Sequence, residues 1–323
     1  MTFMKPTFYL LRDSINSWKE NDAILHASSL AYFTIFSIAP LLIIISAVVG
    51  LVFNQAAVEG LLVNEIEDLV GTEIAVFIED IIGNSPTTTS SSVAAIIGAG
   101  VMLYGASLLF YRLELALNAM WDLVPIEIDV QQSIIAVVKS RTLSAVAALG
   151  LGVYVLIALI ASALWTLIPQ QILQYFFAGI DDIIIAIISL VASPIMYMIP
   201  FAIIYKMLPR AKVRWRDVWL GAMLAAILFW IGGYFIGFYV ARSSFTSFYG
   251  AAGSLVAFLL WVFYSTAVFL FGATFTKSYA AMYGQPIEPY EGMIFKPNHL
   301  EMLKLLGTEI NKTPEQNKKP GSE

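Results

Sequence analysis

The segment Lys206 to Arg216 constrains the fold more than any other part of the chain. It reads KMLPRAKVRWR and carries five Lys or Arg in eleven residues. Long apolar runs flank it, Ile183 to Tyr205 and Val218 to Val240, and each exceeds the roughly 20 residues that an α-helix needs to cross a bilayer. We therefore predict a short loop at one membrane face, and its positive charge places that face in the cytoplasm.

The composition agrees with a chain that crosses a membrane several times. Of the 323 residues, 59% are apolar and 13% are charged, whereas about a quarter of the residues in a soluble domain are charged. The absence of cysteine excludes disulfides, thiolate metal sites and cysteine nucleophiles. The two histidines, His26 and His299, are too far apart in sequence to suggest a histidine-rich metal centre.

We predict an all-α polytopic membrane protein with six transmembrane helices and both termini in the cytoplasm. In this topology Arg242 is the single Lys or Arg of 18 that lies outside the cytoplasmic segments. Residues 1–29 are expected to form a cytoplasmic amphipathic helix, and residues 276–323 a cytoplasmic tail with a disordered end. The six spans are expected at about 30–53, 93–113, 143–168, 183–205, 218–240 and 255–275.

The N-terminal segment has the pattern of a helix that lies on the membrane surface. Four apolar residues recur at helical spacing and share one face: Phe8, Leu11, Ile15 and Trp18. Basic residues recur at every seventh position on a neighbouring flank, where they can reach lipid phosphates: Lys5, Arg12 and Lys19. The alternative is a helix that packs on the protein and only sets the orientation of the chain.

The first outer segment, residues 54–92, is the most acidic part of the sequence. It contains seven Asp or Glu and no Lys or Arg. Two apolar patterns with helical period, separated near Gly71, predict two short amphipathic helices in this loop. Anionic lipid would repel them, so we expect their apolar faces to pack on the protein itself.

Prolines interrupt two of the predicted spans. Pro40 lies inside the first span, and Pro194 and Pro200 lie inside the fourth. Because proline removes a backbone hydrogen bond, these positions are expected to be helix breaks that line a cavity. A kink used only for packing is the alternative. In the fifth span, Gly233 and Gly237 form a GxxxG pair, which predicts close contact with another helix.

Polar residues at the inner end of the second span form a candidate contact site. Glu114, Asn118 and Asp122 recur every four residues on one helix face. Arg112 precedes Glu114 by two residues, and Trp121 is at the depth expected for the membrane interface. These polar residues can bind a substrate head group, or they can cap the helix end and form salt bridges there.

The outer segment 241–254 supplies two further candidate contacts, Arg242 and Tyr249. A cationic side chain near a cavity can hold a phosphate or carboxylate, and it is costly to leave unpaired in apolar surroundings. The alternative is that Arg242 pairs with an acidic residue of the first outer loop.

Five residues make up the basic segment at the inner leaflet: Lys206, Arg210, Lys212, Arg214 and Arg216. The last three alternate with Val213 and Trp215, so an extended hairpin would place the charges on one side and the two apolar residues on the other. This pattern can bind anionic lipid or recruit a partner protein, and anchoring of the topology explains it equally well.

Several segments, in the same order along the chain, resemble the YihY/BrkB family of bacterial inner-membrane proteins. They are LAYFTIFSIAPLLIIISAVVG from Leu30, ALNAMW from Ala116, PFAIIYKMLPRAKVRWRDVWLGAMLAAILFW from Pro200, and YGAAGSLVAFLLWVFYSTAVFLFGA from Tyr249. The resemblance extends over about residues 30–283 and implies a six-helix integral membrane protein. Where the family usually reads Gly-Ala-Glu late in the last span, this chain reads Gly272, Ala273, Thr274.

The resemblance also implies a role in the cell envelope. Members have been proposed to move lipids or other envelope components, and some are associated with virulence or serum resistance. We expect a transporter or flippase-like protein for a lipid or an amphipathic anion, in contact with membrane lipids. A non-enzymatic membrane scaffold that recruits a partner is the alternative, and the glycine contacts are compatible with a homo-oligomer.

The family's historical label, ribonuclease BN, is not expected to apply to this chain. Nuclease chemistry needs convergent carboxylates or a histidine pair beside a basic channel. The inner face offers only the weak acidic pair Glu127 and Asp129 and no histidine motif. No Walker loop, dinucleotide fingerprint or haem pattern appears in the sequence, so we expect no enzyme activity, no cofactor and no nucleic-acid partner.

Overall fold

The computed structural model describes residues 4–50, 108–126, 182–242, 252–290 and 292–297. Within them, two helices are long and apolar enough to cross a membrane: α9 (Trp215–Arg242) and α11 (Gly253–Tyr283). They contain the predicted spans 218–240 and 255–275, and α11 continues eight residues beyond the expected end. The spans predicted at 93–113 and 143–168 lie wholly or mostly outside the described residues, so the six-span topology stays a prediction.

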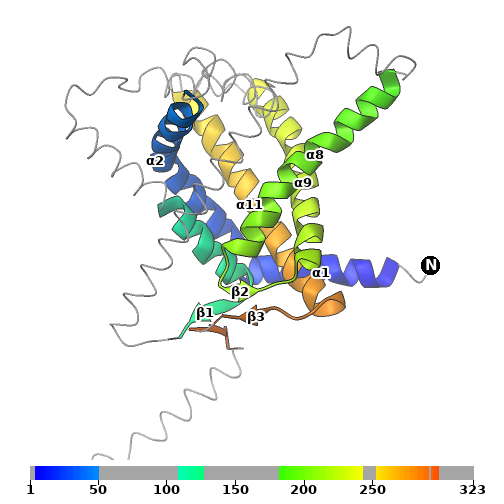
Figure 1. Cartoon of the computed structure of the whole chain (residues 1–323). Coiled ribbons are helices and arrows are strands. Elements are labelled where there is room, and N and C mark those ends of the chain that lie inside the picture. Colours follow the sequence, from blue (N-terminus) through cyan, green and yellow to red (C-terminus); the bar gives the residue numbers. More distant parts are fainter. Residues whose placement is uncertain (1–3, 51–107, 127–181, 243–251, 291, 298–323) are drawn as a thin grey trace, which may run out of the picture.

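The remaining described helices include α1 (Met4–Glu20), α2 (Ala23–Gly50) and α8 (Asp182–Met207), and residues 108–120 are also helical. Figure 1 shows α1 lying across the base of α2, α9 and α11, close to the strands. The sequence predicted one helix over residues 1–29, whereas the first helix ends at Glu20. The chain turns at Asp22, which has a left-handed φ of 49°, and a helix cannot continue through that conformation.

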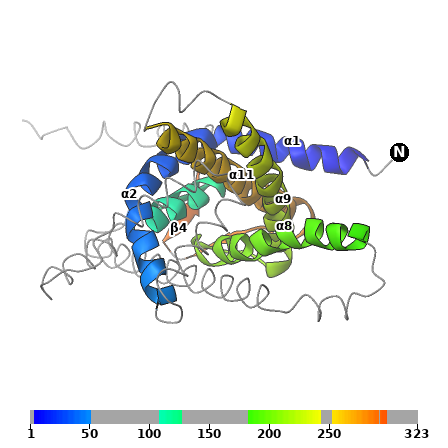
Figure 2. The ribbon, with the colours of Figure 1, turned by 90° about the horizontal axis from the view of Figure 1, so that it is seen from above.

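Helix α11 occupies the centre of this arrangement. It packs against α9, α2 and α1, while α8 packs against α9. Seen from above in Figure 2, α11 lies between α2 on one side and α8 and α9 on the other. The last span of the predicted topology is thus the helix on which the other described helices assemble.

Short strands join distant segments at the base of the helices. β1 (Leu123–Pro125) pairs with β4 (Met293–Phe295), and β2 (Ala211–Lys212) pairs with β3 (Glu288–Pro289), both antiparallel. The all-α prediction holds for most of the described residues, which are helical, but it did not include these short strands. The strands form because the chain after α11 passes beneath the helices and lies extended against two loops, whose backbone groups need partners.

The basic segment is a loop with one paired strand, and it does not form the expected extended hairpin. Lys212 and Arg214 are exposed and Val213 is buried, as the alternation predicts. Trp215, however, is 47% exposed, because α9 begins at this residue and helical geometry replaces the two-residue repeat. The Lys206 ammonium donates a hydrogen bond to the Val213 carbonyl and lies 5.9 Å from the centre of the Trp215 ring.

The expected helix breaks at proline are absent from the described helices. α8 runs without interruption through Pro194 and Pro200, and α2 runs through Pro40. A single proline removes one hydrogen bond, and packing against other helices lets the helical conformation persist on both sides. The prediction that these prolines line a cavity is therefore not supported by any helix break at Pro40, Pro194 or Pro200.

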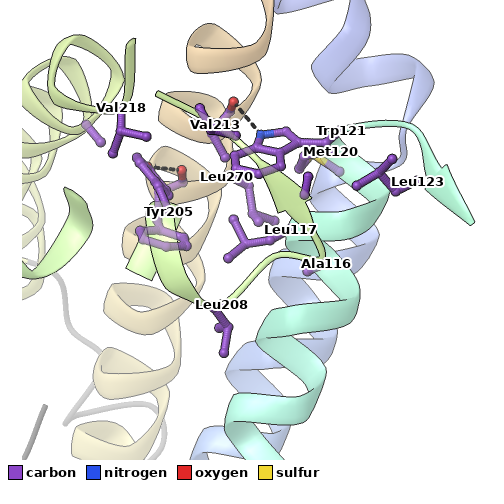
Figure 3. Packing of buried hydrophobic residues seen from close by; sticks show 14 of the residues in the cluster. Ala116, Leu117, Met120, Trp121, Leu123, Tyr205, Leu208, Val213, Val218 and Leu270 are labelled. Carbon is purple, nitrogen blue, oxygen red and sulfur yellow. Dashed lines mark hydrogen bonds between the residues drawn. The ribbon is translucent and has the colours of Figure 1, made fainter. Parts of the chain in front are cut away.

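The buried core of the described residues lies where the helices meet near the base (Figure 3). Trp121, Tyr205, Leu117 and Leu270 are less than 2% exposed. The interfacial depth expected for Trp121 stays a prediction. Its indole is inside the protein because the chain turns directly after it, at Asp122.

Close approach of α9 to α11 depends on Gly221 and Gly272. A Cβ atom added at Gly221 would lie 1.8 Å from the Thr276 Oγ1 and 2.6 Å from the Gly272 carbonyl oxygen. The expected contact residue, Gly237, has nothing within 4 Å of such a Cβ. Backbone contact between these helices thus occurs at Gly221, whereas Gly232, farther along α9, meets the Tyr264 side chain of α11.

The glycine contact gives a prediction about stability. We expect Gly221→Ala to lower the free energy of unfolding by about 1–3 kcal/mol, since the added methyl group forces α9 away from α11. Gly237→Ala is the matched control on the same helix, and its effect should be within about 0.5 kcal/mol of zero. Thermal unfolding of the purified protein in detergent measures both. Equal effects of the two substitutions would contradict the assignment of the contact.

Candidate functional site

Two of the predicted contact residues hold the basic loop in place. Glu114 and Asn118 lie one turn apart on helical residues 108–120, and both side chains are buried. Glu114 Oε1 accepts a hydrogen bond from Arg210 Nε at 2.7 Å, and Asn118 Oδ1 accepts one from the Arg210 backbone N–H at 2.9 Å. We call these three residues the Arg210 latch. Its carboxylate and amide are occupied by the protein itself, which favours the salt-bridge interpretation over a substrate site.

Asp122, the third residue of the predicted face, makes a different set of contacts. It has a φ of 55°, so its side chain turns away from Glu114 and Asn118. Asn21 Nδ2 donates to Asp122 Oδ1 at 2.6 Å, and Lys277 Nζ lies 2.5 Å from Asp122 Oδ2. Lys277 also donates to Ser17 Oγ at 2.7 Å. We call Ser17, Asn21, Asp122 and Lys277 the Asp122 network, and it joins the α1–α2 turn to α11.

Three aromatic side chains from separate segments donate hydrogen bonds to carbonyl oxygens of α11. Trp18 Nε1 donates to Ala267 at 3.2 Å and Trp121 Nε1 donates to Ala273 at 3.0 Å. The Tyr205 hydroxyl donates to Phe269, and the bonds of Trp121 and Tyr205 are drawn as dashed lines in Figure 3. These bonds satisfy buried polar groups and fix the position of three segments on α11.

Thr274 occupies the position at which the resembled family usually has a glutamate. Its side chain is fully buried, and its hydroxyl donates to the Leu270 carbonyl at 2.9 Å, one turn earlier in α11. A hydroxyl satisfied within its own helix needs no further partner. At this position the chain therefore has a packed polar residue in place of a charge.

Asp217 is a buried acidic residue that the sequence analysis did not single out. It lies in the first turn of α9, where the helix dipole favours a negative charge. The side chain is 2% exposed, and its Oδ2 has no hydrogen-bond partner among the described residues. A Cβ at Gly284 would lie 2.6 Å from this oxygen, so only glycine fits where the chain leaves α11.

The two remaining charged candidates are exposed and lie over aromatic rings. The Arg112 guanidinium is 4.6 Å from the centre of the Phe33 ring, and that of Arg242 is 4.1 Å from the centre of the Phe238 ring. Arg242 is the last residue of α9, at the end opposite the basic loop. Tyr249 lies outside the described residues, as do Glu127 and Asp129.

A small cleft opens beside the Asp122 network. Its volume is about 160 Å³, and its polar lining comprises Asn21, Asp22, His26, Asp122 and Lys296. Burial lowers the pKa of His26 from its ordinary value of 6.5, and the negative charge of Asp22 partly offsets this effect. No sequence pattern indicates this cleft, because its residues come from three segments that are distant along the chain.

The comparisons with known proteins agree with the resemblance found in the sequence. The profile of the family described as Virulence factor BrkB matches residues 14–290. The chain belongs to the BrkB family. Similar BrkB relatives are named UPF0761 membrane proteins, so this chain is a membrane protein of that family. No solved structure matches it.

The relatives are distant, and they are longer than this chain. The protein from Ralstonia nicotianae is 26% identical over 77% of this chain and 53% of its own length. The protein from Psychrobacter sp. is 25% identical over 93% of this chain and 53% of its own. A third, from Xanthomonas campestris pv. campestris, is 26% identical over 87% and 62%. The chain thus spans between about half and two thirds of the length of the BrkB proteins that it matches.

The Arg210 latch gives a second prediction. We expect Glu114→Ala to lower the free energy of unfolding by about 3 kcal/mol, because it leaves the Arg210 guanidinium without its buried partner. Glu288→Ala is the matched control, since Glu288 pairs with Lys212 at 3.8 Å on the surface, and such pairs contribute less than about 1 kcal/mol. Chemical unfolding in detergent compares the two. A larger effect of Glu288→Ala would show that the latch does not hold the loop.

His26 gives a third prediction, on the pH dependence of stability. Because the pKa is lower in the folded protein than in the unfolded chain, the contribution of His26 is complete above pH 6.5 and is lost as the pH falls toward the folded pKa. His26→Gln cannot be protonated and should therefore show a smaller drop in melting temperature between about pH 7.5 and about pH 5. An unchanged pH profile would contradict the burial of this imidazole.

Proposed function

We propose that this protein is a multi-pass protein of the bacterial inner membrane that transports a lipid or another amphipathic anion. The observation that supports the proposal is the outward face of α9, on which exposed apolar side chains lead to a single guanidinium. An amphipathic anion has the same two parts, an apolar chain and a charged head group.

The apolar part of this face extends along most of α9. Seven residues at helical spacing are each more than a third exposed: Met223, Ile227, Ile231, Tyr234, Phe235, Phe238 and Tyr239. The four aromatic residues all lie in the half of α9 that is remote from the basic loop. Rigid aromatic rings in contact with hydrocarbon offer a surface along which an acyl chain can lie.

The charged part is Arg242, which belongs to the same face because it follows Phe238 by one helical turn. No carboxylate of the described residues lies within 4.0 Å of its guanidinium. The acidic residues of segment 54–92, which are the alternative partners, lie outside those residues. A guanidinium next to an apolar surface favours a phosphate or carboxylate partner, because two parallel hydrogen bonds form with either group.

The fourth prediction tests this transport function with labelled lipids in vesicles. Protein in vesicles of phosphatidylcholine and phosphatidylglycerol should accelerate the movement of labelled phosphatidylglycerol between leaflets, measured by dithionite quenching. We expect Arg242→Ala to slow this movement about tenfold, since a charge-assisted hydrogen bond is lost. Arg242→Lys keeps the charge without the planar group and should give an intermediate rate.

Arg112→Ala serves as the comparison, because Arg112 is also an exposed arginine stacked on an aromatic ring. A similar slowing by Arg112→Ala would attribute the effect to loss of charge in general and not to the end of α9. If folded protein moves no lipid, or if Arg242→Ala moves lipid at the full rate, the anion site at Arg242 should be abandoned.

A membrane scaffold that recruits a partner is the second candidate, and the exposed basic loop favours it. Arg214 and Arg216 are exposed, and neither forms an ion pair with a described residue. Replacement of Lys212, Arg214 and Arg216 by glutamine should leave lipid movement unchanged under the transport proposal. Under the scaffold alternative, the same replacement should abolish co-purification of the partner while membrane insertion persists.

A further inference from the structure

Helix α1 exposes a stripe of large apolar side chains. Its protein-facing side buries Leu10 to 5% and Ser14 to 0% exposure, and the adjoining turn buries Asn21 to 8%. Its outward side carries Phe8, Leu11 and Ile15, which are 63%, 37% and 42% exposed. A helix that covers the core of a water-soluble protein directs such apolar residues inward. The surroundings of the outward side are therefore expected to be apolar.

The basic and acidic residues of α1 lie at different angles around the helix from this apolar stripe. Arg12 follows Phe8 by four residues and Lys19 follows Ile15 by four, so both cations border the stripe along one flank. The acidic residues Asp13 and Glu20 lie about one hundred degrees farther round the helix. All four side chains are exposed, and none forms an ion pair with another described residue. Such an order suits a helix at the surface of an anionic bilayer. The apolar residues face the acyl chains, the cations lie at the phosphates, and the acidic residues face water.

The position of α1 in the fold agrees with that surface. Figures 1 and 2 both show α1 crossing the base of α11, with its N-terminal half extending past α9 and α11. Its C-terminal half is held by the bond from Trp18 Nε1 to Ala267 and by the contact of Ser17 with Lys277. Fixed at one end, α1 is presented at the level where α9 begins with Trp215 and Trp219, residues typical of the membrane interface.

We propose that α1 is an in-plane membrane helix whose stripe of Phe8, Leu11 and Ile15 enters the bilayer interface, while Arg12 and Lys19 bind the phosphates of anionic phospholipids. The occupant of this face is lipid of the leaflet on the basic-loop side. The proposal concerns a different helix from the Arg242 site and the opposite end of α9, so neither depends on the other.

The absence of cysteine from the chain allows a direct test on the full-length protein. An environment-sensitive fluorophore is attached at Ile15→Cys on the stripe, or at Asn16→Cys, one residue farther along on the polar side. The labelled proteins are placed in nanodiscs of phosphatidylcholine with or without phosphatidylglycerol, and quenching by lipids brominated on the acyl chain is measured. Leu11→Cys is a second stripe position in case Ile15→Cys fails to fold.

We expect strong quenching at Ile15 or Leu11 and weak quenching at Asn16, because only the stripe reaches the acyl chains. Phosphatidylglycerol should increase the quenching at the stripe. Arg12→Gln with Lys19→Gln should remove that increase, with a decrease of about fivefold in lipid affinity for each charge.

Three results would overturn the proposal. Equal, weak quenching at Ile15 and Asn16 would place the stripe in water. A probe at Ile15 that is shielded from water but not quenched by brominated lipid would show that protein, either a second copy or a partner, covers the stripe. Quenching at Ile15 without any dependence on phosphatidylglycerol would show that Arg12 and Lys19 do not bind the head groups.

Discussion

The need to satisfy buried polar groups on one central helix organises the described part of this protein. Trp18, Tyr205 and Trp121 each bring a single N–H or O–H donor into the interior, and each donor reaches a carbonyl of α11. An unpaired donor in such surroundings would cost several kilocalories per mole, of the order of a whole hydrogen bond. The three bonds therefore specify where α1, α8 and residues 108–120 lie along α11, whereas apolar packing alone would tolerate sliding.

At the base of the helices, charged side chains also fix the positions of segments relative to one another. Asp122 adopts a left-handed backbone conformation that few residues other than Asn, Asp and Gly tolerate. In that conformation its carboxylate reaches both the α1–α2 turn and Lys277, and its backbone carbonyl accepts the Lys296 N–H at 2.6 Å. Asp122 thus links three segments, each of which lies more than 100 positions from it in sequence. The Asp122 side chain is 36% exposed, and its carboxylate pairs with Lys277.

The sequence predicted well those features that depend on local pattern. The apolar runs gave the two membrane-compatible helices α9 and α11, the alternation around Lys212 gave a buried Val213, and the four-residue spacing placed Glu114 and Asn118 on one face. The BrkB family was recognisable from several short segments taken together. Each of these features is decided by neighbours within about one turn or strand, which is the range over which periodicity carries information.

Features that depend on contacts between distant segments were missed. The GxxxG pair Gly233 and Gly237 predicted a helix contact, but the pattern did not indicate the backbone contact of α9 with α11 at Gly221. Trp121 was expected at interfacial depth, where a tryptophan near a span end is usually found, and its burial against α11 was not predicted. Asp217 and Lys277 look like ordinary charges at helix ends, and only the fold shows that one is buried and the other belongs to the Asp122 network.

The paired strands at the base have a mechanical consequence. Through β2–β3 and β1–β4, the chain that follows α11 is joined to the loop between α8 and α9 and to the residues after position 122. The ends of these helices at the base are therefore joined by backbone hydrogen bonds of two strand pairs, while no described strand or ion pair joins the ends near Arg242. The base acts as a fulcrum, so that a small tilt of α9 against α11 is amplified with distance and is greatest at Arg242, a helix length of about 40 Å away.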